Sequence, residues 1–384
     1  MGEGAFLVLT CVSAIWIVYF IKTMATLTEA SVVARKAIKW GAIGFVGITI
    51  LWYIGVAALD YYKLLNPPPL PPAGASFGVL SELNFPASKD RPKMSLELPT
   101  GVIPAFPDRM RVYWAPTKRS GFADADTAVD TATALGFLFK PFQPTETDYI
   151  WTNQDQLSSK LEMNIISGHF VLSRQWQNNP ALATMGNFQS DKQVITETEN
   201  YIKRIGLLND DAVGVEKVTY LKNDAAKLVS ALSLSDADFV QLDLFRKNID
   251  EIDPNSKTKE IKASYPFYRT DPSKGLIRVV VSGSKIQSEK VVYMDYEYTN
   301  IDYAKNSTYP VKTGEEAWDE LSGGGGFVTP IGPRSGEVKI RRVFLGYYDS
   351  NENQKYAMPI FVFLGDQGFT AYVSAVRNEW IEKK

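Results

Sequence analysis

The hydrophobic pattern of the chain begins with two uncharged apolar runs, at residues 5–21 and 40–59. A helix rises 1.5 Å per residue, so about 20 apolar residues cross the hydrocarbon core of a bilayer. We therefore predict two transmembrane helices at these positions, forming a helical hairpin within residues 1–64. A cleaved signal peptide is the alternative for the first run, but its start, Met-Gly-Glu-Gly, lacks the basic region of such peptides.

Charge on either side of these runs predicts their orientation. The connecting segment carries four basic residues and the single acidic residue Glu29; the basic ones are Lys22, Arg35, Lys36 and Lys39. Basic segments stay in the cytoplasm, so both chain ends are expected outside. The prediction is a plasma-membrane protein with two spans, the lipid bilayer as a partner and an extracytoplasmic C-terminal domain. Residues 23–39 are good helix formers and are expected along the inner surface.

The second run carries glycines at every third position, Gly41, Gly44 and Gly47. Small residues let membrane helices approach closely, which makes this a possible packing face. The alternative is that glycine is simply common in such helices. After this run, residues 65–75 hold five prolines in six positions, and such a segment forms a stiff extended stalk.

Beyond the stalk, short amphipathic helices alternate with strand-like runs, which predicts an α+β fold of antiparallel sheets with helices on one face. We expect three tandem α+β modules, at residues 76–180, 181–305 and 306–384. The expected helices are 124–135, 192–205, 224–234 and 313–321. The expected strands are 147–153, 160–173 with a turn at Gly168 and His169, 215–221, 275–282, 291–298, 338–348, 357–364 and 369–376. A polar stretch at 248–260 is expected to be a surface loop.

Composition excludes several kinds of chemistry. Cys11 is the only cysteine and lies in the first apolar run, so the soluble part has no disulfide and no cysteine nucleophile. His169 is the only histidine, whereas zinc sites and Ser–His catalysis need at least one and often two or three. Nothing in the net charge of −2 indicates binding to nucleic acid, which needs a basic face. We predict no catalytic residue, no cofactor-binding residue, no metal ligand and no nucleic-acid partner.

A few side chains remain candidates for function. His169 could sense pH, although an exposed turn residue is the simpler interpretation. Asp295 and Glu297 share one face of a strand, as paired hydrolase carboxylates would, but a solvated sheet face also explains them. Aromatic residues are abundant, and some tyrosines are predicted to form an exposed surface for a partner: Tyr296, Tyr298, Tyr303, Tyr347 and Tyr348.

The last third of the chain resembles a known family. The resemblance rests on a helix containing Glu-Ala-Trp, a glycine turn, a strand ending Gly-Tyr-Tyr and a strand with Pro before Phe and Val. These residues are Glu316, Ala317, Trp318, Gly346, Tyr347, Tyr348, Pro359, Phe361 and Val362. They are similar to the PepSY-like units of YycH/YycI-type regulators, which are membrane-tethered and control a sensor histidine kinase. The resemblance implies a non-enzymatic role in regulating a neighbouring envelope protein.

Three hypotheses follow for the function. The first is a membrane-anchored extracytoplasmic protein that binds and regulates or scaffolds another bacterial envelope protein through protein–protein interaction, without enzymatic activity. The second is a structural subunit of an envelope, secretion or adhesion assembly. The third is an envelope hydrolase that uses carboxylates.

Overall fold

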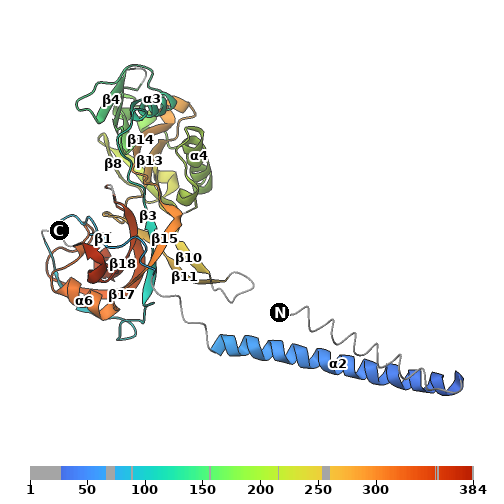
Figure 1. Ribbon diagram of the computed structural model, residues 1–384. Coiled ribbons are helices and arrows are strands. Elements are labelled where there is room, and N and C mark those ends of the chain that lie inside the picture. The colour runs from blue at the N-terminus through green and yellow to red at the C-terminus, as the bar shows by residue number, and fades with distance from the viewer. Residues whose placement is uncertain are drawn as a thin grey trace. The chain divides into compact units, whose positions relative to one another are not determined.

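A computed structural model describes residues 27–65, 74–87, 90–154, 157–214, 216–252, 260–350, 352 and 354–382 (Figure 1). The chain forms two compact units, residues 1–71 and 72–384. The second unit is a mixed α+β structure with many strands and few helices, which confirms the α+β part of the predicted fold class.

The described part of the first unit is one long helix, α2 (Leu27–Leu65). Its segment Ile38–Leu59 is long and apolar enough to cross a membrane and contains the whole predicted span 40–59. At 1.5 Å per residue these 22 residues cover about 33 Å. The predicted span 5–21 lies outside the described residues, as does most of the stalk. Residues 27–39, expected as a connector along the membrane surface, continue the same helix.

One eight-stranded sheet belongs to the terminal lobe, which we define as residues 74–114, 249–268 and 302–382. Its centre is the antiparallel series β17 (Glu337–Tyr348), β18 (Tyr356–Gly365) and β19 (Thr370–Ser374). Around it pair β2 (Lys93–Leu96), β3 (Arg109–Trp114), β12 (Phe267–Tyr268), β15 (Asp302–Pro310) and β16 (Phe327–Val328). Smaller pairs are β1 (Leu80–Ser81) with β20 (Ile381–Glu382), and β10 (Ile249–Ile252) with β11 (Ile261–Tyr265).

Strand β18 shows why this lobe is stable. It is a nearly continuous apolar run, and such strands are buried on both faces. On one face Phe361 and Phe363 pack with Ala317 and Leu321 of helix α6 (Gly314–Ser322). On the other face Ile360 and other β18 residues pack against the segment 77–85 that follows the stalk. Helix α6 begins with a capping box, in which Thr313 and Glu316 exchange side-chain to backbone hydrogen bonds.

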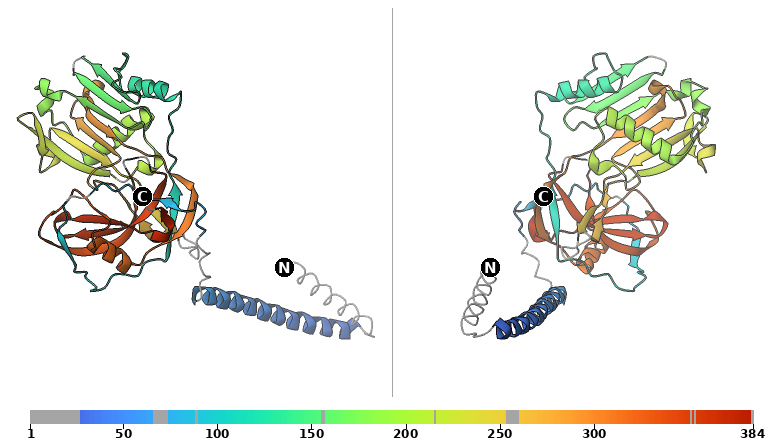
Figure 2. Two further views of the ribbon diagram at one scale, coloured as in Figure 1. Left: turned by 60° about the vertical axis from the view of Figure 1, so that its left-hand side comes forward. Right: turned by 90° about the vertical axis from the view of Figure 1, so that its right-hand side faces the viewer.

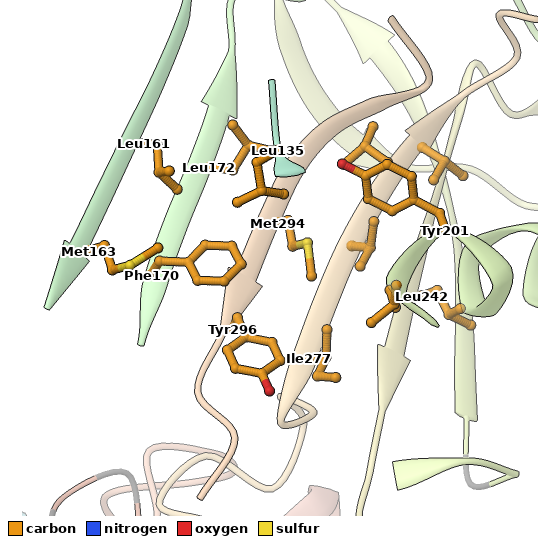
Figure 3. Close-up of a cluster of buried hydrophobic side chains, with 14 of the residues drawn as sticks. Leu135, Leu161, Met163, Phe170, Leu172, Tyr201, Leu242, Ile277, Met294 and Tyr296 are labelled. Carbon is orange, nitrogen blue, oxygen red and sulfur yellow. The ribbon is translucent and has the colours of Figure 1, made fainter. Parts of the chain in front are cut away.

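The second eight-stranded sheet forms the insert lobe, residues 124–244 and 277–296. Its order is β4 (Asp148–Asn153), β5 (Ser159–Asn164), β6 (Phe170–Arg174), β14 (Val291–Tyr296), β13 (Ile277–Ser282), β9 (Phe239–Leu244), β7 (Glu216–Asp224) and β8 (Lys227–Ser230). Helices α3 (Asp124–Ala134) and α4 (Asp191–Arg204) share a core with one face of the sheet (Figure 3), and a short helix, α5 (Gln287–Lys290), precedes β14.

The chain passes between the two lobes four times, at residues 115–123, 245–248, 269–276 and 297–301. The lobes are visible as separate bodies in all views (Figures 1 and 2). The segments expected as three modules share these sheets: β6 pairs with β14 across the expected boundary at 180, and β3 pairs with β15 across the boundary at 305. The insert lobe therefore consists of two insertions, one between β3 and β10 and one between β12 and β15 of the terminal lobe.

Two local predictions are wrong. Residues 224–234 form the end of β7 and strand β8 rather than a helix, joined by a two-residue turn at Ala225 and Ala226. The stretch 248–260, expected as a loop, contains strand β10, whose partner β11 follows it. In both places pairing with a neighbouring strand overrides a local propensity.

Candidate functional sites

A buried ion cluster joins the two lobes. The guanidinium of Arg246, which follows β9, donates to Asp349 after β17 at 2.9 Å and also pairs with Asp211. Its Nη2 atom donates to the backbone oxygen of Thr299 at 2.6 Å. Burial alone would lower the pKa of Arg246, but the two carboxylates outweigh this and raise it well above its ordinary value. This cluster is structural, because every charge in it has a partner.

The predicted tyrosine surface is largely wrong, because most of these side chains are interior. Tyr296, Tyr347 and Tyr348 are buried in the hydrophobic cores. Tyr298 is half-buried, and its hydroxyl donates to Asp211 at 2.9 Å, as does that of Tyr303. Alternation along a strand indicates which side chains share a face but not which face is covered, and here both faces of the sheets are covered.

The paired carboxylates Asp295 and Glu297 both have cationic partners. Lys274 contacts both, at 2.6 Å and 2.9 Å, and Arg269 contacts Glu297 at 2.6 Å. Burial raises the pKa of Glu297, but these cations outweigh burial, so the net pKa lies below its usual value. A general acid in a glycosidase needs the opposite shift. The expectation of a solvated sheet face is also wrong for Asp295, which is buried.

His169 lies just before β6 and lines a cavity of about 540 Å³ beside the connections between the lobes. Its ring is half-buried rather than exposed, and its Nε2 atom has no hydrogen-bond partner among the described residues. Burial lowers the pKa of His169, against smaller opposing effects of Glu297 and the Tyr298 backbone. The imidazole is therefore neutral near pH 7.

Three strongly exposed apolar side chains of the insert lobe lie within five residues of one another, in the segment after α3. Leu138 is 78%, Phe139 74% and Phe142 69% exposed. We call these three residues the apolar patch. The segment leads to β4 at the end of the lobe that lies away from the terminal lobe (Figure 1). Exposed apolar side chains that lie together on a surface commonly mark interaction sites.

The apolar patch is held in a fixed backbone. Phe142 and Ile150 of β4 exchange two backbone hydrogen bonds, of 2.7 Å and 2.8 Å, which attach the segment to the edge of the sheet. Pro141 and Pro144 restrict the backbone on either side. A surface ordered before binding loses less conformational entropy when it binds. The patch was not among the predicted sites, although the run Phe-Leu-Phe-Lys-Pro-Phe is visible in the sequence.

The glycine face of α2 is exposed at two of its three positions. Gly41 and Gly44 are exposed and Gly47 is half-buried, and a Cβ added at any of them would meet nothing within 4 Å. A packing role for this face stays a prediction. Within the described residues, no group of three or more His, Cys, Asp or Glu side chains could hold a metal ion.

Comparison with protein-family models and with curated proteins found no match. A crystal structure of an uncharacterized protein from Eubacterium rectale is similar over 69% of this chain and 82% of that chain, with 10% sequence identity and a TM-score of 0.31. Neither a shared fold nor a function is inferred from a likeness at this level.

Proposed function

We propose that this protein is a membrane-anchored, non-enzymatic binding protein of the cell envelope, which regulates or scaffolds a partner protein through the apolar patch. The observation that carries the proposal is the preorganised exposure of Leu138, Phe139 and Phe142. Aromatic side chains of this kind supply much of the binding energy in protein interfaces when a partner covers them.

The proposal places the patch outside the cell. Spans at 5–21 and 40–59 with a basic connector would export everything after the stalk. The YycH/YycI resemblance supports the same role, since a capped helix followed by three antiparallel strands is what α6, β17, β18 and β19 form. On this proposal the third module is PepSY-like and the partner is another membrane or envelope protein.

A site-specific crosslink tests the partner. A photoreactive phenylalanine analogue at position 139, in the full-length protein in native membranes, should join the chain to a different protein. Replacing Leu138 and Phe142 by serine should remove most of this adduct, because the apolar contact is lost. Both replaced side chains are exposed, so the fold should be retained.

Leu232 provides the matched control position. It is 96% exposed and follows β8, at the opposite edge of the same sheet from β4. The analogue at position 232 should give no such adduct. Equal adducts from 139 and 232 would contradict the proposal, and adducts only with the chain itself would favour the structural-subunit hypothesis. Crosslinks only to lipid would indicate that the patch contacts the membrane.

A further inference from the structure

A cavity of about 720 Å³ opens on the insert lobe between the ends of α3 and α4, the start of α5 and the strands β4 to β6. Its walls are partly apolar, from Leu135, Phe137, Leu157 and Ile205. The ionisable side chains that line it are Arg174, Arg204 and Tyr201. Among the described lining residues there is no aspartate and no glutamate, so the described part of the lining carries a net positive charge.

The two arginines are held in position by the protein. Arg174, at the end of β6, donates to the backbone oxygens of Val291 at 2.5 Å and Leu135 at 3.3 Å. Arg204 ends α4, and its guanidinium carbon lies 5.7 Å from the centre of the Tyr201 ring. Within the described part of the chain, no carboxylate forms an ion pair with either arginine.

Arg174, which is half-buried, differs in this respect from the buried Arg246, which lies in the connection after β9. Arg246 has two carboxylate partners, whereas the hydrogen bonds of Arg174 to described residues go to neutral backbone oxygens. Burial lowers the pKa of Arg174 with no carboxylate to oppose it. Withdrawing a charge from water without a counter-charge is costly to the folded state, and an ionisable group perturbed in this way in a cleft is a candidate for a binding site.

Donors remain available for such a ligand. A guanidinium has five N–H groups in a planar fork, and backbone oxygens take two of those on Arg174. Burial raises the pKa of the nearby Tyr201 hydroxyl, so this hydroxyl keeps its proton and can donate it. Figure 3 shows Tyr201 reaching from α4 over the sheet with its hydroxyl toward Leu135.

We infer that this cavity binds a small ligand with an anionic head, a carboxylate or a phosphate, on an apolar body. The anion would lie between Arg174, Arg204 and the Tyr201 hydroxyl, since guanidinium groups bind both anions through paired hydrogen bonds. The apolar body would lie against Leu135 and Leu157. This inference is independent of the proposed function, because the apolar patch lies outside the lining of the cavity.

Thermal unfolding of the full-length protein in detergent tests the inference with three probes that share one alkyl chain. Hexanoate and hexyl phosphate carry the two candidate anions, and hexylammonium carries the opposite charge. A ligand that binds only the folded state raises the unfolding temperature with its concentration. We expect saturable stabilisation by at least one anion and none by hexylammonium. Hexanoate alone would assign a carboxylate ligand, and hexyl phosphate alone a phosphate.

Variants locate the site. Arg204→Gln removes an exposed charge, so the fold should be retained, and the anion concentration for half-saturation should rise about tenfold. Ser288→Trp at the cavity wall should block both anions without changing any charge. Arg334→Gln, an exposed arginine of the terminal lobe, should behave as the wild type. Equal stabilisation by hexylammonium, or an anion effect that survives both Arg204→Gln and Ser288→Trp, would overturn the inference.

Discussion

His169 immediately precedes β6 with a half-buried ring, and its environment rather than its residue type decides its ionisation. Burial holds its pKa below the ordinary value near 6.5, so the folded protein resists the proton that the unfolded chain accepts. The environments of Arg246 and Arg174 likewise differ, although both are arginines. One is stabilised by two carboxylates and the other has none among the described residues.

His169 makes the stability of the protein depend on pH. The pKa of His169 is lower in the folded state than in the unfolded state. As the pH falls from 7 through 6.5 toward the folded-state pKa, the unfolded state therefore binds more protons than the folded state does. The free energy of unfolding should therefore fall over that range, by at most about 1.4 kcal/mol per pH unit for one proton. Denaturant unfolding followed by tryptophan fluorescence would measure it.

His169→Gln is the matched variant for this prediction. The only histidine is then absent, so acidic groups alone contribute to the pH dependence below 7. The free energy of unfolding of the wild type minus that of the variant should become more positive as the pH rises, and should level off above pH 7. Parallel curves for the two proteins would show that His169 has the same pKa folded and unfolded.

At the scale of elements, turn geometry decides what residues 224–234 become. Alanine, lysine and leucine favour a helix locally, yet the segment forms a hairpin whose strand β7 pairs with β9. Ala225 and Ala226 have φ values of 48° and 65°, a left-handed turn that side chains with a Cβ disfavour. Two positive φ values between paired strands match a type I′ turn, for which Asn-Gly is preferred.

Ala225→Asn with Ala226→Gly should therefore stabilise the protein by roughly 1–2 kcal/mol, by removing left-handed strain. In the helix that the sequence predicts, the same change would instead destabilise by about 1 kcal/mol. A higher denaturant midpoint for the double variant would indicate the hairpin, and a lower midpoint would indicate the helix. Ala181→Gly, at an exposed position with φ −68°, is the control and should give no gain.

At the scale of the whole molecule, the two main features are an apolar helix and a soluble unit with an inserted lobe. Residues Ile38–Leu59 are apolar enough for a bilayer, and the soluble unit builds two sheets from a chain that passes between lobes four times. Local unfolding of either lobe must therefore disturb connections to the other. The ion cluster of Arg246, Asp211 and Asp349 lies at these connections and couples the lobes energetically.

Thiol labelling tests the proposed topology. In a Cys11→Ser background, single cysteines at Glu3, Lys36 and Glu352 report the N-terminus, the basic segment and the soluble unit. A membrane-impermeant maleimide on intact cells should label positions 3 and 352, and should label position 36 only after lysis. Protection of position 352 in intact cells would refute the extracytoplasmic role. If position 3 were also protected in intact cells while position 352 was labelled, the chain would cross the membrane only once.

Features that depend on near neighbours in the chain follow from the residue pattern. The apolar run at 40–59, the capping box of Thr313 and Glu316 and the strands of 338–376 depend on residues a few positions apart, and the structure has each of them. The α+β class follows from the same periodicities. The hairpin at 224–230 does not follow from them, because its stability comes from β9, which lies further along the sequence.

The sequence by itself determined a helix apolar enough to cross a membrane, the class of fold and the scarcity of cysteine and histidine, because these depend on composition and on short-range periodicity. Only the tertiary structure decided which tyrosines are buried, which arginines have carboxylate partners and where the apolar patch and the positively charged cavity lie. Those properties arise when distant segments pack, as Arg246 does with Asp349, and no local pattern encodes which segments will meet.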